Sequence, residues 1–331
     1  MTNIYEVAKK AGVSISTVSQ VYSRHRYVAK DTVEKVLKAA DEMKYVPHRV
    51  AQGLATGRKL TIGLHFPFAS IYPTYNPYYQ ELLEGLSSAA AKFGYSFLML
   101  SNESANFESK EILERVDGAI VVDPDSRSQV IDELLTLSKP VVTTGRYMGE
   151  GALPWVDNHF AQQVAHLFEH FNEQGYRFPV LLSTEGDVSF LVDVEEAYAE
   201  EINKRNLKPW IVRSKGIQEE QDYMSVLQIL RHDPLPDVVL ALTDYQAAIV
   251  LRLANDLGIH VPTQMGVVGF GDTVIARYTH PPLTSVSVES HLIGNSAIEL
   301  LLNLINGRED IENRYIPSRI VLRSSSVRKA Q

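Results

Sequence analysis

The stretch IYEVAKKAGVSISTVS, residues 4–19, predicts two short helices joined by a tight turn. Asn3 and Glu6 have the spacing of a helix N-cap and its partner three residues on, so the start of the first helix is marked. Gly12 breaks the pattern and allows a sharp turn. The apolar face of the first helix has i, i+3, i+4, i+7 spacing and consists of Ile4, Val7, Ala8 and Ala11.

Two further helices complete a small domain. Ser14 can cap the second helix, which carries Val18 and Val21 inward. A third helix follows a polar, basic loop and ends at the segment 45–47, because a residue before proline is biased away from helix. Its expected inward face consists of Val33, Val36, Leu37 and Ala40. Three short helices with a tight turn between the first two form a helix-turn-helix domain.

Charge is divided unevenly along the chain. Residues 1–59 contain eleven Lys and Arg against five Asp and Glu, a net charge of +6, whereas the remainder carries −14, which gives the total of −8. A small basic module on a large acidic body suits a protein that holds DNA with one part and binds something else with the other. The alternative is that the three helices form a structural cap that never meets DNA.

From residue 60 onward, short apolar strands alternate with amphipathic helices. This alternation predicts parallel sheets with right-handed crossovers, hence a doubly wound α/β core, and leaves open whether there is one sheet or two. The expected strands are TIGLHF (61–66), YSFLML (95–100), GAIVV (118–122), PVVTT (140–144), PVLLS (179–183), WIVR (210–213), DVVLAL (237–242), MGVVGF (265–270) and TSVSV (284–288).

The whole chain resembles the lactose-repressor family of bacterial transcription regulators. The segments that carry the resemblance are IYEVAKKAGVSISTVS, YVPHRVAQGLATG (45–57), TIGL (61–64), NPYYQELLEGLSSAAAKFGY (76–95), VDN (156–158), MGVVGFGDT (265–273) and HPPLTSV (280–286). The resemblance implies three parts: a DNA-binding head at 1–47, a hinge helix and linker at 48–59, and a core at 60–331. The core would consist of two periplasmic-binding-protein-like lobes, the first about 60–158 plus 289–316 and the second about 161–287 plus 317–329.

This resemblance also implies a function. We expect a homodimeric repressor in the cytoplasm that binds near-palindromic operator DNA under the control of a small-molecule effector between the lobes. A dimer is expected because RSSSVRKAQ (323–331) lacks the apolar heptads that tetrameric members add. No apolar run is long enough to span a membrane, and the absence of Cys excludes disulfides and thiolate chemistry. We expect no cofactor and no metal.

The second helix and the loop after it are expected to meet DNA. The family usually carries Arg at the position of Gln20, where Arg would pair with guanine, whereas Gln suits adenine. The expected major-groove residues are Ile15, Ser16, Thr17 and Gln20. Phosphate contacts position the protein on the duplex and do not read the base sequence. The residues expected to make them are Thr17, Ser19, Ser23, Arg24 and Arg26.

The linker supplies two further expected DNA contacts, Arg49 and Leu54. Paired hinge helices of the family enter the minor groove and insert a leucine between base pairs, which kinks the duplex. Leu54 is the large side chain among small neighbours in QGLATG, residues 52–57. The alternative is that Leu54 packs on its own domain.

Two motifs could instead indicate an enzyme. His166, Glu169 and His170 match H-x-x-E-H, a zinc-peptidase signature, although the helical wheel places the histidines on a solvated side without a cleft. Gly269 and Gly271 follow a strand but lack the third glycine of a dinucleotide fingerprint. We therefore expect no enzyme, and a metal-dependent hydrolase remains the alternative.

The expected effector pocket departs from that of sugar-sensing relatives. Positions where the family usually has polar groups that clasp hydroxyls are occupied here by Phe68, Gly145, Val194, Thr243 and Gly271. Two tyrosines, Tyr78 and Tyr79, are expected to bind the effector, and they belong to a loop that also contains Tyr72 and Tyr75. The remaining polar anchors are expected to be Arg146, Asp244 and Asp272. A larger or more apolar ligand is favoured, such as an oligosaccharide or glycoside stacked on tyrosines. The alternative is a decayed pocket and constitutive repression.

Overall fold

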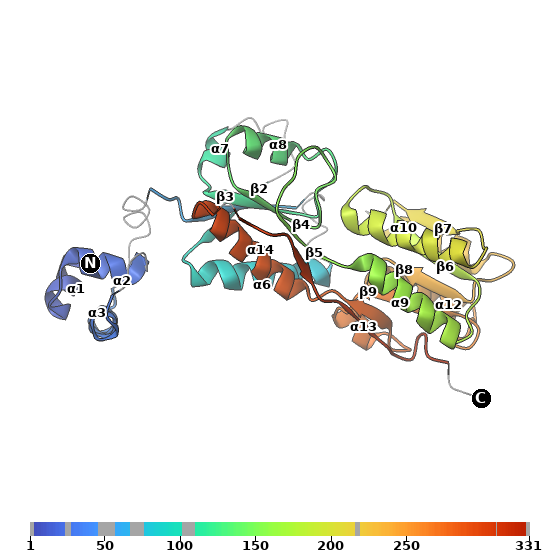
Figure 1. Ribbon diagram of the computed structural model, residues 1–331. Helices are drawn as coiled ribbons and strands as arrows, with labels where there is room; N and C mark the ends of the chain where they lie inside the picture. Colours follow the sequence, from blue (N-terminus) through green and yellow to red (C-terminus); the bar gives the residue numbers. More distant parts are fainter. Residues whose placement is uncertain are drawn as a thin grey trace. The chain divides into compact units, whose positions relative to one another are not determined.

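The computed structural model describes residues 3–23, 28–45, 57–66, 76–100, 110–215, 219–308 and 310–328. The chain divides into two compact units, Met1–Leu60 and Thr61–Gln331 (Figure 1). No helix within these described ranges is long and apolar enough to cross a membrane.

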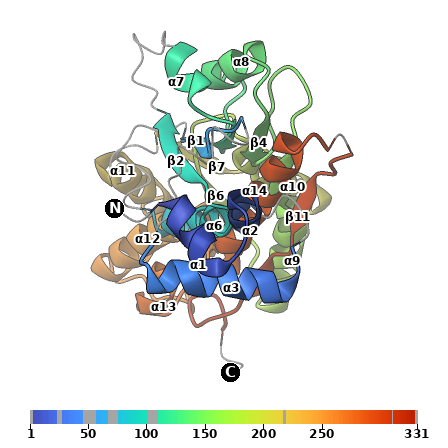
Figure 2. The same ribbon diagram turned by 90° about the vertical axis from the view of Figure 1, so that its left-hand side faces the viewer.

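The small unit contains three helices, α1 (Ile4–Ala11), α2 (Ile15–Ser23) and α3 (Lys30–Glu42) (Figure 2). The predicted capping box is present: the Asn3 carbonyl oxygen Oδ1 accepts from the Glu6 amide, and Glu6 Oε2 from the Asn3 amide, both at 3.1 Å. Gly12 ends α1 in the left-handed conformation, with φ of 67°. Ser14 Oγ accepts from the Thr17 amide at 3.1 Å, which caps α2 as expected.

The core of this unit differs from the prediction at one position. Its buried side chains are Val7, Ala8, Val18, Val21, Val36, Ala39 and Ala40. Leu37, expected to point inward, is 48 % exposed. Ala39 is buried in its place, so the inward face of α3 is centred between Val36 and Ala40 rather than on Leu37.

The large unit contains two six-stranded sheets in the part of the chain that the structure describes. The first has the order β11-β5-β4-β3-β1-β2, all in parallel pairs. Its strands are β1 (Thr61–His65), β2 (Ser96–Leu100), β3 (Gly118–Val122), β4 (Val141–Thr144), β5 (Trp155–Asn158) and β11 (Arg314–Ile316). Helices α6 (Pro77–Lys92) and α14 (Ser290–Ile305) cover one face, and α7 (Lys110–Glu114) and α8 (Gln129–Thr136) the other (Figure 1).

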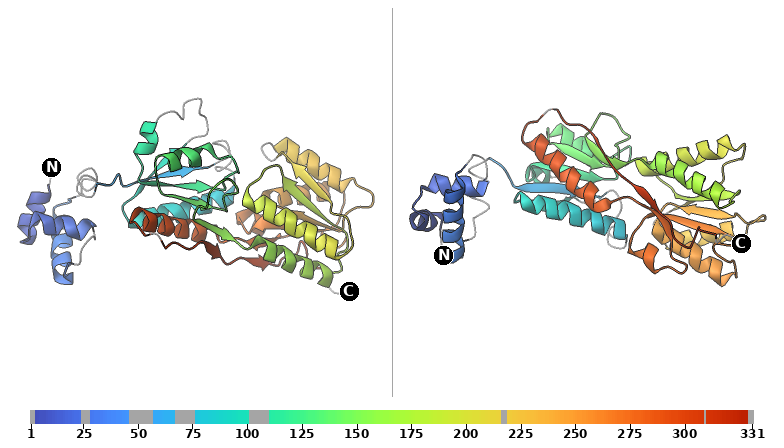
Figure 3. Two further views of the ribbon diagram at one scale, coloured as in Figure 1. Left: turned by 45° about the horizontal axis from the view of Figure 1, so that its top comes forward. Right: turned by 60° about the horizontal axis from the view of Figure 1, so that its bottom comes forward.

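The second sheet has the order β12-β10-β9-β8-β6-β7, with β12 antiparallel to β10. Its strands are β6 (Pro179–Thr184), β7 (Ile211–Ser214), β8 (Val238–Ala241), β9 (Gly266–Gly271), β10 (Thr284–Ser287) and β12 (Arg319–Val321). Helices α9 (Phe160–Glu173) and α10 (Ser189–Lys204) cover one face; the other carries α11 (Glu219–Leu230), α12 (Asp244–Asp256) and α13 (Val274–Tyr278) (Figure 3). Each sheet with its helices is one lobe.

The chain passes between the lobes three times: after β5, after β10 and between β11 and β12. Each lobe is therefore built from segments that are far apart in the sequence. Within the first lobe, α6 and α14 approach closely at Gly85 and Gly294. A Cβ atom on Gly85 would lie 2.2 Å from the His291 carbonyl oxygen, so only glycine fits this contact.

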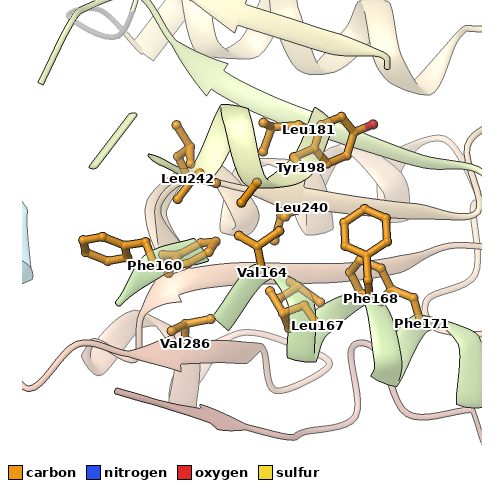
Figure 4. Packing of buried hydrophobic residues seen from close by; sticks show 14 of the residues in the cluster. Phe160, Val164, Leu167, Phe168, Phe171, Leu181, Tyr198, Leu240, Leu242 and Val286 are labelled. Carbon is orange, nitrogen blue, oxygen red and sulfur yellow. The ribbon is translucent and has the colours of Figure 1, made fainter. Parts of the chain in front are cut away.

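The second lobe has a core of interlocking rings and aliphatic chains (Figure 4). Phe168, Phe171 and Tyr198 lie deep in it, and the buried Tyr198 hydroxyl donates to the carbonyl oxygens of Pro179 and Trp210 at 2.9 and 3.1 Å. Phe160 lies at the start of α9, at the end of this core that borders the site described next.

Candidate functional site

The described residues expected to meet DNA gather on one face of α2. Val18 and Val21 are buried, whereas Ile15 is 39 % exposed and Ser16 is exposed beside it. The Ser14 hydroxyl lies 2.7 Å from that of Ser16 and 2.8 Å from that of Thr17. The half-buried side chains Thr17, Ser19 and Gln20 complete this group.

Other expected DNA contacts lie outside the described residues. These are Arg24, Arg26, Arg49 and Leu54, together with nearly all of the expected hinge helix. Ser23 ends α2, but its side chain is not described. The expectations for these residues therefore remain predictions from the sequence.

A cavity of about 150 Å³ lies between the two lobes. It opens at the carboxyl ends of parallel strands in both sheets, where open α/β sheets bind ligands. The first lobe contributes Asn76, Pro77, Tyr78, Tyr79, Asp123 and Asp157. The second contributes the ends of β6, β7, β8 and β9 with the starts of α9, α10 and α12, including Phe160, Thr184, Glu185, Phe190, Lys215, Thr243, Asp244, Tyr245, Phe270 and Gly271.

Aromatic rings form two walls of the cavity. Phe190 lies 4.6 Å from Phe160 and 5.7 Å from Phe270, measured between ring centroids, so three elements of the second lobe share one aromatic wall. In the first lobe, Tyr78 and Tyr79 contact each other edge to face at 4.9 Å. Both tyrosines that the sequence proposed for effector binding therefore lie at the cavity.

Asp244 lines the cavity at the start of α12 and is 1 % exposed. Its carboxylate accepts from the Ser285 hydroxyl at 2.6 Å and from the amide and hydroxyl of Thr273 at 2.6 and 2.8 Å. Burial raises the pKa of Asp244 to about 6, although these hydrogen bonds oppose the shift. Asp244 therefore orients the segment after β9 as well as facing the cavity.

Sequence reasoning missed two carboxylates of the cavity, Asp123 and Asp157. Asp157 accepts from the Asn158 amide at 2.8 Å, the Ser189 hydroxyl at 3.2 Å and the Arg146 amide at 3.3 Å. Asp123 accepts from the Tyr79 hydroxyl at 3.0 Å. Burial raises the pKa of Asp123 to about 7 and that of Asp157 to about 6. Their position at the end of an apolar strand could have revealed these carboxylates in the sequence; for Asp123 that strand is GAIVV.

The other two proposed anchors are engaged elsewhere and are not among the described residues that line the cavity. The Arg146 guanidinium is ion-paired with Asp193 on α10. Asp272 pairs with Arg323 at 2.6 Å, and its amide donates to the Ser285 hydroxyl at 2.9 Å.

The positions at which the family usually has polar groups do not all line the cavity. Thr243 and Gly271 line the cavity, as the family pattern implied. Gly145 follows β4 in the left-handed region, with φ of 83°, and Val194 is fully buried in the core of the second lobe. Phe68, Tyr72 and Tyr75 lie outside the described residues.

The helical wheel placed the histidines of the α9 motif on the solvated side, but the structure buries one of them. His166 and Glu169 are exposed, but His170 is 6 % exposed, and its Nε2 lies 2.9 Å from the Ser326 hydroxyl. His170 thus packs under the C-terminal segment rather than facing solvent, which corrects that expectation. Within the described ranges no three His, Cys, Asp or Glu side chains form a group that could hold a metal ion.

Gly269 and Gly271 lie within β9 itself, and Gly269 has a packing role. A Cβ atom on Gly269 would lie 2.6 Å from Asp244 Oδ1, so this glycine lets the strand approach the buried carboxylate. The close approach accounts for Gly269 without a nucleotide.

A helix-turn-helix unit joined to a two-lobed core with an inter-lobe cavity defines a class of proteins, the ligand-controlled DNA-binding regulators. Residues 3–48 match the family model described as bacterial regulatory proteins, lacI family, and residues 168–326 match the periplasmic binding protein-like domain. Both parts of the chain are therefore similar to those of lacI-family transcription regulators, a DNA-binding head followed by a periplasmic binding protein-like domain.

Individual relatives agree over nearly the full length. The catabolite control protein A of Staphylococcus epidermidis is 28 % identical over 332 residues, which cover 98 % of each chain. Two solved structures show the same fold, each at 23 % identity. A lac repressor dimer bound to operator has a TM-score of 0.77 and covers 99 % of each chain; a CelR–cellobiose complex has a TM-score of 0.73 over 98 % of this chain and 100 % of the other.

Proposed function

We propose that this chain is a cytoplasmic homodimeric repressor that binds near-palindromic operator DNA and releases or tightens it when an effector enters the inter-lobe cavity. The observation that carries the proposal is the exposed face of α2, centred on Ile15 and Ser16, on a unit of net charge +6. This face would enter the major groove, with the basic unit facing phosphate. The lac repressor structure, a dimer bound to operator, supports this arrangement.

The effector of the proposal is an oligosaccharide or glycoside. The aromatic wall of Phe160, Phe190 and Phe270 offers flat surfaces for the CH faces of sugar rings. Cellobiose, the disaccharide in the complex of one structural relative, supports this class of ligand. Constitutive repression is the second candidate, and it is supported by glycine and valine at positions 145, 271 and 194.

Selection of DNA fragments by the full-length chain tests DNA binding. Ser16→Glu places a negative charge on the exposed face of α2 and should abolish binding to the selected fragments. Thr136→Glu adds the same charge on an exposed position of α8, and this control should leave binding intact. Equal binding by both variants would refute the assignment of α2. Effector control is tested separately, by adding disaccharides to the bound complex.

A further inference from the structure

The charge of the cavity lining is strongly unbalanced. Among the described residues that line it, four are carboxylates, Asp123, Asp157, Glu185 and Asp244, and one is cationic, Lys215. Glu185 and Lys215 are both exposed and follow the neighbouring strands β6 and β7. Together these two exposed side chains carry no net charge. Three carboxylates remain in its interior, and the described lining residues include no cation beside them.

Of the nearby arginines, Arg146 lowers the pKa of Asp157 by its charge, but neither Arg146 nor Arg323 acts on Asp123. The Arg146 guanidinium is paired with Asp193, and that of Arg323 with Asp272 at 2.6 Å. The stretches 67–75 and 216–218, which adjoin lining residues Asn76 and Lys215, contain no Lys, Arg or His. A buried carboxylate without a cation is costly in its charged form. The interior therefore favours either a proton or a ligand cation.

Asp123 is the carboxylate best placed to meet such a cation. Asp157 and Asp244 each accept three hydrogen bonds from the protein, whereas the Tyr79 hydroxyl is the one donor to Asp123 within the described residues. A carboxylate offers about four acceptor positions, so Asp123 keeps most of its capacity. The titratable groups around it are Tyr78, Tyr79 and Asp157. None of these three carries a positive charge.

The walls of the cavity suit the same kind of ligand. Aromatic faces attract cations as well as the CH faces of sugar rings. Phe160, Phe190 and Phe270 provide such faces in the second lobe, while Tyr78 lies beside Tyr79 in the first, next to Asp123.

We propose that the cavity takes a ligand that carries a protonated amine, paired with Asp123, on a body with flat apolar faces such as an amino sugar. Phosphorylated and carboxylated analogues are rejected because they would add negative charge beside three carboxylates. This inference rests on the proposed effector role of the cavity and narrows the oligosaccharide class to its amine-bearing members.

The test compares ligands of matched skeleton on the full-length chain by calorimetry. One series is the β-1,4 disaccharide of glucosamine, its N,N′-diacetyl form, cellobiose and cellobiose 6-phosphate. A second series is benzylamine, benzyl alcohol and benzoate. The amine of each series should bind most tightly and the anion should not bind. Because burial raises the pKa of Asp123 to about 7, binding of benzylamine, which is already protonated at neutral pH, should also release protons, measured from the buffer dependence of the heat.

Two variants test whether Asp123 causes the preference for amine ligands. Asp123→Asn keeps the shape and removes the charge, so amine affinity should fall roughly ten- to hundredfold while cellobiose affinity stays unchanged. Asp256→Asn, at the exposed end of α12, should change neither. A neutral or anionic member that binds as tightly as the amine, or the absence of binding by both amines, overturns the proposal. Neither outcome bears on DNA binding, because the comparison of Ser16→Glu with Thr136→Glu measures DNA binding in the absence of ligand.

Discussion

Arg146 of the first lobe is ion-paired with Asp193 of the second. The Arg146 amide also donates to the Ser189 hydroxyl at 2.9 Å, on the same helix α10. A third bond between the lobes joins the Ser126 amide to Asp187 at 3.2 Å. The chain thus holds its two lobes together with its own side chains along the start of α10.

Asp193→Asn should loosen the lobes relative to each other. The pair is largely buried, with side-chain exposures of 28 % and 14 %, and its loss should lower the free energy of unfolding by about 1 kcal/mol. Small-angle scattering of the full-length chain should show a larger radius of gyration. Glu195→Gln, on the same helix α10, breaks the pair that Glu195 makes with Arg213 of β7 within the second lobe, and should leave that radius unchanged. Equal expansion of both variants would contradict this role.

Gln20→Arg should change the preferred operator at one base pair. Gln matches the N6 and N7 edge of adenine and Arg matches the O6 and N7 edge of guanine, so preference should move to G·C by about 1–3 kcal/mol. Competition between operators that differ at that pair measures the shift. Gln162→Arg adds the same charge on an exposed position of α9 and should not alter preference. Identical preferences for the Gln20→Arg variant and the parent chain would refute the contact.

Leu54→Ala should abolish most specific DNA binding and the bending of the operator. The expected cause is loss of the wedge that opens a central base step. Circular-permutation gel shifts report the bend. Leu207→Ala removes a half-exposed leucine of the second lobe and serves as the control. Retained bending in the Leu54 variant would favour the alternative in which Leu54 packs on its own domain.

Acidity should stabilise the unliganded core. Burial raises the pKa of Asp123 to about 7 and those of Asp157 and Asp244 to about 6. A carboxyl with a raised pKa binds its proton more tightly in the folded chain, so its stabilisation is complete below about pH 4 and is lost as the pH rises to 7.

Thermal unfolding from pH 5 to 8 measures this effect. The melting temperature should fall with rising pH, and the fall should be shallower in Asp123→Asn than in the parent chain or in Asp256→Asn. A profile of Asp123→Asn that superimposes on that of the parent chain would contradict the assignment.

Local sequence signals predicted most of the fold. The capping box at Asn3 and Glu6 and the turn at Gly12 act within a few residues, and each of the nine apolar runs contains a strand. The sequence did not reveal β5, β11 and β12, because they are only three or four residues long and two of them lie at sheet edges. Such strands are defined by the neighbours with which they pair, not by their own composition.

The site was less accessible to sequence reasoning, because it depends on which lobe each side chain faces. Tyr78, Tyr79 and Asp244 could be placed at the cavity from the family pattern. The engagement of Arg146 by Asp193 could not, since the partners are 47 residues apart and belong to different lobes. His170 was misplaced for a related reason: a single helical wheel does not show that the C-terminal segment covers that side of α9.

The three passages between the lobes set the order in which the core can be completed during translation. The first sheet needs β11 at Arg314–Ile316 for its edge and α14 for one face, and the second needs β12 at Arg319–Val321. Nearly the whole polypeptide must therefore leave the ribosome before either lobe can close its sheet. A nascent chain that stops after β10 would expose the part of the first sheet that α14 covers, and would be a natural target for chaperones and proteases.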